Sequence, residues 1–128
     1  MIRGIFVRND GPVPYADKIV DGEKTIETRS RNMLGKLVGH PVVIIATGRG
    51  KKPMCIGSAW IANAVKATAE RMDTIRDQTL IPAGSEFDTG SRWCYFLINP
   101  KRFKTPIPLP EDAVRHGLSW AEWWTKRD

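Results

Sequence analysis

The sequence comprises 128 residues, of which 41% are hydrophobic and 27% are charged, which fits a single domain over residues 1–128 and excludes intrinsic disorder and multidomain mechanisms. Its 20 lysines and arginines outnumber its 14 acidic residues, and the formal net charge of +6 suits a partner that carries phosphates. The apolar runs are far shorter than the ~18 residues of a membrane span, so we expect a cytoplasmic protein that does not engage membranes.

The first part of the chain predicts a strand, a short helix and a second strand. Residues 2–8 show the alternation of a core strand. A helix is expected over 14–21, because Pro14 suits a first helical position and Gly22 suits the residue that ends a helix. Residues 25–31 are rich in Thr and Ile, which favours a second strand.

A hairpin with a basic tip is expected next. Residues 42–47 are mainly β-branched, and residues 55–65 resume an extended pattern after a proline. Between the two segments lie three cations, Arg49, Lys51 and Lys52. The pattern therefore predicts two antiparallel strands joined by a positively charged turn.

A longer helix and further extended structure follow. Residues 68–80 place apolar side chains on one side and charged side chains on the other, which predicts the main helix. Residues 93–98 are apolar on both faces and predict a buried strand that ends at Asn99. Residues 103–109 contain prolines that forbid a helix and permit only an edge or irregular strand.

The C-terminal segment is rich in tryptophan and predicts a helix over about 119–126. Ser119 and Glu122 have the spacing of a capping box, and a stripe at i, i+3 and i+4 is formed by Trp120, Trp123 and Trp124. We expect this helix to pack on the sheet. Together the elements predict an α+β fold, with one mostly antiparallel, barrel-like sheet and flanking helices.

A short motif after the first helix concentrates the candidate chemistry. Gly22, Lys24, Glu27 and Arg29 follow the spacing G-x-K-x-x-E-x-R. On a strand Glu27 and Arg29 share a face and can pair, and the amine of Lys24 can turn toward the same pocket. Such a cluster suits a small anionic or polar ligand. An ordinary Glu–Arg pair beside a solvated lysine is the alternative explanation of the same spacing.

This motif resembles the mark of the ASCH family, a helix running into G-x-K-x-x-E-x-R, and the order of elements is similar over roughly residues 2–98. The resemblance implies a PUA-like β-barrel of a kind that commonly binds RNA, with the motif residues lining a cleft beside the barrel. The family is also similar to small bacterial amidohydrolases that remove the acetyl group from N4-acetylcytidine, and nuclease activity has been proposed for other members.

One position departs from the amidohydrolase pattern. A threonine stands there where this sequence has Glu27, so the obvious hydroxyl nucleophile is missing, although Thr25 and Thr28 lie nearby. The further carboxylate of that pattern has four candidates, Glu70, Asp73, Asp77 and Glu86. Binding of RNA or a nucleotide is therefore the expected function. The alternative is a small amidohydrolase or ribonuclease with Lys24 as base and Glu27 as its acid–base partner.

More ligand-binding residues are expected around the motif. The hairpin cations can contact a phosphate backbone, although they can also serve only to keep a loop soluble. Tyr15 and Trp60 are candidate platforms on which bases stack, although both are also common core residue types. The full set of expected binding residues is Gly22, Lys24, Glu27, Arg29, Arg31, Tyr15, Arg49, Lys51, Lys52 and Trp60.

Cysteines, histidines and glycines predict neither a metal site nor a cofactor. Cys55 and Cys94 lack the paired spacing of zinc ligands, and His40 and His116 lie in connectors without a nucleophile motif. No glycine pattern matches a phosphate loop or a dinucleotide fingerprint. The sequence leaves the oligomeric state open, and a third possible function is a protein-interaction module that uses the terminal tryptophans.

Overall fold

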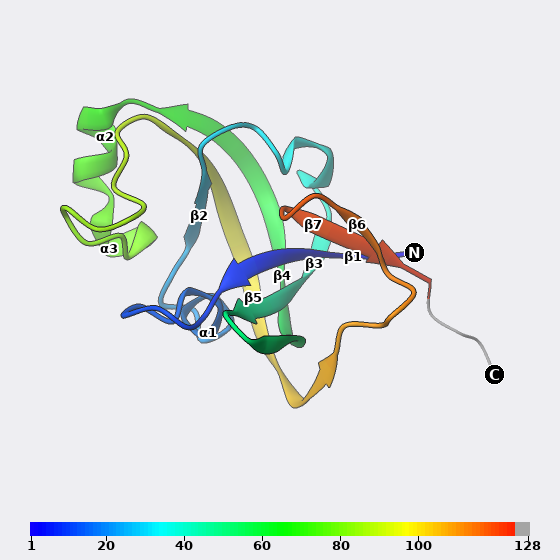
Figure 1. Ribbon diagram of the computed structural model, residues 1–128. Helices are drawn as coiled ribbons and strands as arrows, with labels where there is room; N and C mark the ends of the chain where they lie inside the picture. The colour runs from blue at the N-terminus through cyan, green and yellow to red at the C-terminus, as the bar shows by residue number, and fades with distance from the viewer. Residues whose placement is uncertain (125–128) are drawn as a thin grey trace.

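The computed structural model describes residues 1–124, in which seven strands alternate with short helices (Figure 1). The expected first strand, first helix, second strand and hairpin are all present. The elements are β1 (Ile2–Arg8), α1 (Tyr15–Val20), β2 (Ile26–Arg29), the 3-10 helix η1 (Gly35–Leu37), β3 (Pro41–Gly48), β4 (Lys51–Ala67), α2 (Ala69–Thr74), α3 (Arg76–Thr79), β5 (Arg92–Pro108), β6 (Val114–His116) and β7 (Trp120–Trp123).

The strands form one mixed sheet in the order β2-β5-β4-β3-β1-β7-β6. Neighbouring strands are antiparallel except for β1 and β3, which run parallel. The predicted α+β class is confirmed. Within residues 1–124 the backbone ladder leaves β2 and β6 as free edges, so the sheet is not closed and the expected barrel is not confirmed.

The two longest strands of the sheet, β4 and β5, run side by side and pair with each other (Figure 1). The expectation that the second of them ends at Asn99 is wrong, because β5 continues from Arg92 to Pro108. Asn99 adopts a positive φ of 52°, and the β4–β5 register shifts at three places. Such irregularities let a strand bend and continue, so the proline-rich segment 103–108 still pairs with β4, on an edge where prolines are tolerated.

Helix α1 is short because the chain on both sides of it is fixed. Its first turn is held by Asn9, whose side chain accepts a hydrogen bond from the backbone N–H of Asp17 at 3.0 Å. After the helix, Gly22 has φ +83°, a left-handed conformation that glycine adopts readily. The carbonyl of Lys18 then accepts the backbone N–H groups of both Glu23 and Lys24. This tight turn leads directly into β2.

The expected helix over 68–80 is interrupted. Thr68 caps α2 through its side-chain oxygen, but the chain leaves helical geometry at Ile75 before α3 begins. Leu80 ends α3 with a positive φ of 59°. The two short helices lie beyond β2 at one end of the molecule, opposite β6 and β7 (Figure 1).

The predicted C-terminal helix is wrong over the described residues: residues 120–123 form β7, which pairs antiparallel with β1. In a strand, positions i and i+3 face opposite sides. Trp120 and Trp123 accordingly pack into two different apolar clusters, each less than 10% exposed. Both are therefore unavailable as an interaction surface, and of the three tryptophans in this segment only Trp124 is exposed. The remainder of the predicted helix, 125–128, lies outside the described residues.

Candidate functional site

A cleft of about 430 Å³ opens between β1, β2, the start of β5 and the β3–β4 and β6–β7 turns. It contains the motif side chains and a marked excess of cations. Its polar and charged lining includes six cationic side chains and a single carboxylate. These charged residues are Arg8, Lys24, Arg29, Lys51, Arg92, Arg115 and Glu27.

The three charged side chains of the motif converge at the base of this cleft. One carboxylate oxygen of Glu27 lies 3.6 Å from Nζ of Lys24, and the other lies 3.1 Å from Nη2 of Arg29. Glu27 thus joins the two cations in a continuous cluster, as the motif spacing predicted. The alternative of a solvated lysine is excluded, because the Lys24 residue is only 2% exposed.

Lys24 is held in place by the short helices. Its ammonium group donates a hydrogen bond of 2.5 Å to the carbonyl oxygen of Thr79, at the end of α3, and lies 4.9 Å from the ring centre of Tyr15. Burial lowers the pKa of Lys24, because the charged form loses its hydration, and Glu27 opposes that shift. The amine is therefore easier to deprotonate than an ordinary lysine.

Arg29 connects β2 to strands on the other side of the cleft. Its Nη2 donates to the carbonyl oxygen of Phe6 at 2.6 Å as well as to Glu27, and its Nη1 lies 3.4 Å from the carbonyl oxygen of Ser119. This side chain bridges from the free edge β2 to β1 and to the turn before β7. Both Nη2 protons are engaged within the protein, so Arg29 has fewer donors for a ligand than the motif alone suggested.

Arg92 is a cleft residue that no sequence pattern indicated. It begins β5 and is 8% exposed. Its Nε and Nη2 donate to the hydroxyl and carbonyl oxygens of Thr28, at 2.8 and 3.3 Å, and its Nη1 donates to the hydroxyl of Thr89 at 2.9 Å. Burial lowers its pKa, the negative charge of Glu27 opposes that shift, and the nearby positive charge of Arg29 acts in the same direction as burial.

An aromatic wall accompanies these cations. Tyr15 and Phe87 both line the cleft and meet edge to face, with ring centres 5.8 Å apart. The guanidinium carbons of Arg8 and Arg92 lie 5.8 and 5.9 Å from the ring centre of Phe87. The same two rings also border an adjoining recess of about 300 Å³. No sequence pattern indicated Phe87 either, because it lies in a loop with no motif of its own.

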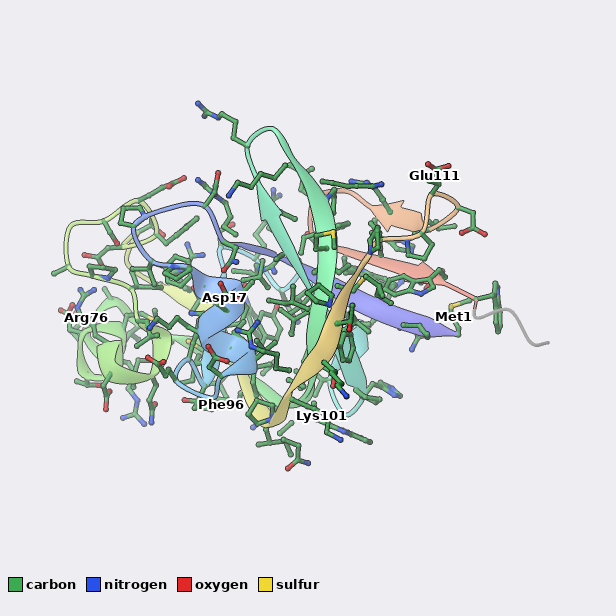
Figure 2. The ribbon with its side chains drawn as sticks, turned by 90° about the horizontal axis from the view of Figure 1, so that it is seen from below. Met1, Asp17, Arg76, Phe96, Lys101 and Glu111 are labelled. Atoms are coloured by element: carbon green, nitrogen blue, oxygen red, sulfur yellow. The ribbon has the colours of Figure 1, made fainter. Side chains whose placement is uncertain are left out.

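The remaining predicted residues divide into two groups. Tyr15 and Lys51 line the cleft. Five others are not among its lining residues, namely Gly22, Arg31, Arg49, Lys52 and Trp60. Gly22 shapes the turn before β2, whereas Trp60 is 44% exposed on β4 and pairs across the ladder with Ile98. The hairpin tip projects from the body of the sheet (Figure 2), and its turn is fixed by Asp10, which accepts the backbone N–H of Arg49.

The candidate catalytic groups differ in whether they line the cleft. Thr28 lines the cleft and is buried, whereas Thr25 is exposed. Of the four candidate carboxylates, Glu86 borders the adjoining recess and pairs with Arg8 at 2.9 Å. Glu70, Asp73 and Asp77 line neither cavity.

Metal ligands do not gather anywhere in residues 1–124, where no group of three or more acidic, histidine or cysteine side chains is arranged to hold an ion. Both cysteines are buried as free thiols, and burial raises the pKa of Cys55 to about 11. Over the same described range, no helix has the length and apolar character needed to cross a membrane.

Comparison with known proteins decides the fold. The sequence matches no family model and no curated protein. Solved structures do match: the ASCH protein from Zymomonas mobilis superposes with a TM-score of 0.66 at 22% identity, over 86% of this chain and 73% of that one. A serine-to-alanine variant of that protein gives a TM-score of 0.71 at 20% identity, over 97% of this chain and 88% of the other.

The chain has the fold of the ASCH proteins. The resemblance drawn from the motif is therefore confirmed at the level of the fold. The ASCH-like arrangement accounts for the position of the motif, because it brings β2 and the turn after α1 to the edge of the cleft.

Proposed function

We propose that the cleft of this ASCH-like domain binds RNA or a nucleotide. The observation that carries the proposal is the combination of six cations, one carboxylate and an aromatic wall within a single recess. Phosphates pair with arginine and lysine, and bases stack on aromatic rings and guanidinium planes. The volume of about 430 Å³ falls in the range of small-ligand sites.

Each motif residue has a role in this proposal. Lys24 supplies positive potential at the base of the cleft, and Glu27 fixes the orientation of Arg29 while offering an acceptor to a donor edge of a base. Lys51 lies where the basic hairpin meets the cleft and steers phosphates toward it. Tyr15 and Phe87 offer surfaces for stacking.

Two adjacent lysines of the hairpin provide a matched test. Lys51 lines the cleft, whereas its neighbour Lys52 does not, although both are exposed. We expect K51E to weaken binding of a fluorescein-labelled single-stranded RNA about tenfold at low salt, because it places a negative charge beside the phosphates. The slope of log affinity against log salt should fall by about 0.7, the value for one phosphate contact on a single strand.

The control is K52E, which makes the same charge change one residue away. Its affinity should fall by no more than about threefold, through the general field of the protein alone. Fluorescence anisotropy at several salt concentrations measures both effects. Equal losses in the two variants would contradict binding in the cleft, and an unaltered affinity in both would remove the hairpin from the proposal.

A second candidate function is hydrolysis of an acylated nucleoside or of RNA. The lowered pKa of the buried Lys24 favours it, because a lysine whose pKa is lowered can act as a general base. Glu27, at 3.6 Å, is placed to exchange a proton with it. In this candidate, the lysine activates a water molecule or a hydroxyl group, and the carboxylate returns the proton to the leaving group.

Incubation with N4-acetylcytidine and with short RNAs tests this candidate. Product should form with the wild-type protein and at least 100-fold more slowly with K24A, the loss typical of a removed general base. The matched control is K18A, which removes a partly exposed lysine that pairs with Glu23 and does not line the cleft. Equal product from K24A and K18A, or no product from wild type, would leave binding as the function.

A further inference from the structure

Arg92 differs from the other buried or paired arginines of the described chain in lacking a carboxylate partner. Arg29, Arg76 and Arg102 each have a carboxylate oxygen within 4.0 Å, whereas Arg92 has none within residues 1–124. Asp88, the acidic residue nearest to it in sequence, is engaged elsewhere: it pairs with Arg76 at 3.0 Å and accepts the backbone N–H of Gly84 at 2.8 Å.

The hydrogen bonds of Arg92 engage its N–H donors but do not neutralise its positive charge. All three acceptors are uncharged oxygens of Thr28 and Thr89. The Arg92 residue is 8% exposed, so its guanidinium group has lost part of its hydration, and neutral acceptors do not fully replace that loss. Arg92 is thus held rigidly, and within residues 1–124 no carboxylate lies within 4.0 Å to pair with its positive charge, which Glu27 stabilises only from a longer distance.

The same imbalance extends across the base of the cleft. Lys24, Arg29 and Arg92 are three cations with low exposure, and Glu27 is the only carboxylate that lines the cleft with them. With the lysine protonated, the group carries an excess of two positive charges. A ligand with a charge of about −2 would neutralise the excess positive charge of this cluster, whereas an uncharged ligand would leave that excess in place.

We propose that the cleft selects nucleotides bearing a terminal phosphate monoester, whose phosphate is bound by Arg92 together with Lys24. This inference rests on the proposed nucleotide-binding function and specifies its ligand class. A phosphate monoester carries about −1.5 to −2 charges at pH 7, because its second pKa is near 6. An internal phosphodiester carries one negative charge and a nucleoside carries none. The terminal phosphate is therefore the group that matches the excess of two.

Neighbouring residues place the rest of the nucleotide. Phe87 lies against Arg92 and meets Tyr15 edge to face, so the aromatic wall begins where the phosphate would sit. The base of a bound nucleotide can contact Phe87 while its phosphate contacts the guanidinium group of Arg92. The hydroxyls of Thr28 and Thr89 fix the guanidinium plane in advance, which lowers the entropy lost on binding.

The test compares ligands that share the same nucleoside and carry about two, one or no negative charges. Isothermal titration of the full chain at pH 7.5 uses the four nucleoside 5′-monophosphates, their methyl phosphate esters, which carry one negative charge, and the matching nucleosides. For at least one base, we expect the monophosphate to bind at least tenfold more tightly than its methyl ester and still more tightly than its nucleoside. The 3′-monophosphates show which end of an RNA is preferred.

Two variants assign the effect to Arg92. R92Q removes the charge but keeps a side-chain amide, and it should reduce the preference for monophosphate over methyl ester to about threefold or less. R71Q removes an arginine of α2 that does not line the cleft, and it should keep the full preference. Persistence of the full preference in R92Q would overturn the role of Arg92.

The wild-type protein provides a measurement that does not depend on R92Q folding. Between pH 7.5 and pH 5 the monophosphate loses its second charge, so its advantage over the methyl ester should fall to about threefold or less. The methyl ester keeps one charge throughout and corrects for titration of groups in the protein. Equal binding of monophosphate, methyl ester and nucleoside would overturn this inference and leave nucleotide binding standing. Absence of binding by all of these ligands and by RNA would overturn both.

Discussion

Replacing Glu27 by glutamine is expected to lower the free energy of unfolding by about 3 kcal/mol, the scale of breaking a buried ion pair by removing one partner. The carboxylate lies between Lys24 at 3.6 Å and Arg29 at 3.1 Å, and Arg92 lines the same cleft. Glutamine keeps the size of the side chain but leaves the cations without their negative neighbour. Urea denaturation followed by circular dichroism measures the loss.

The matched variant K24M should behave differently. It removes a buried ammonium group and reduces the positive excess, while Glu27 keeps its pairing with Arg29. The carbonyl of Thr79 loses a donor, which offsets part of the gain. We expect the stability of K24M to stay within about 1 kcal/mol of wild type. Equal stability of E27Q and wild type would show that the cluster is not held together by charge.

The pH dependence of stability provides a second readout of the same pair. Since the pKa of Lys24 is lower in the folded protein than in the unfolded chain, the folded state releases this proton first as the pH rises. Between the lowered pKa and about 10.5, the unfolded chain holds more protons, so the contribution of Lys24 to stability increases with pH. K24M should lack this contribution, whereas K18M should retain it.

The sequence predicted the motif cluster because the information is local. Glu27 and Arg29 alternate on one strand, and Lys24 follows the helix-ending glycine, so four to eight residues of chain determine their relation. Arg92 lies 64 residues from Thr28, with which it forms hydrogen bonds. No periodicity or spacing in the sequence predicts this contact between Arg92 and Thr28, because it depends on the pairing of β5 with β2.

The C-terminal tryptophans show how a helical pattern can belong to a strand. Spacing of i and i+3 indicates one face of a helix, but it also places residues on opposite faces of a strand. Here both faces of β7 are covered, so Trp120 and Trp123 are buried against different clusters. Glu122, which suggested a capping box, instead approaches Arg3 and His116. When both faces of a strand are buried, apolar residues at i and i+3 therefore do not indicate a helix.

The hairpin illustrates a similar limit on charge patterns. Three cations within four residues predicted one basic contact surface, but consecutive residues of an extended chain point in opposite directions. Lys51 reaches the cleft while Lys52 does not. The amino-acid composition of the hairpin shows that its tip is basic. Only the geometry of the strand shows which of the two lysines can contact a ligand in the cleft.

Gly57 is the position where an added methyl group should disturb the fold most directly, and we expect G57A to lose about 3 kcal/mol of stability through overpacking. A Cβ there would collide with the carbonyl oxygen of Lys101 on β5 and would lie 2.6 Å from Cγ1 of Val20. The first obstacle is backbone and cannot rotate away. Relief therefore requires β5 to separate from β4 at this point, and the contact with Val20 also pushes α1 away from β4. Thermal and urea denaturation measure the cost.

The consequence reaches the cleft because α1 leads directly into the turn that carries Lys24. A displaced helix moves this lysine away from Thr79 and Glu27, so G57A should also weaken binding of RNA at temperatures where it remains folded. The control is G11A, where an added Cβ has no heavy atom within 4 Å, and its stability should stay within about 0.5 kcal/mol of wild type. If G57A were as stable as G11A, the close packing of α1 on β4 would not determine the position of the motif.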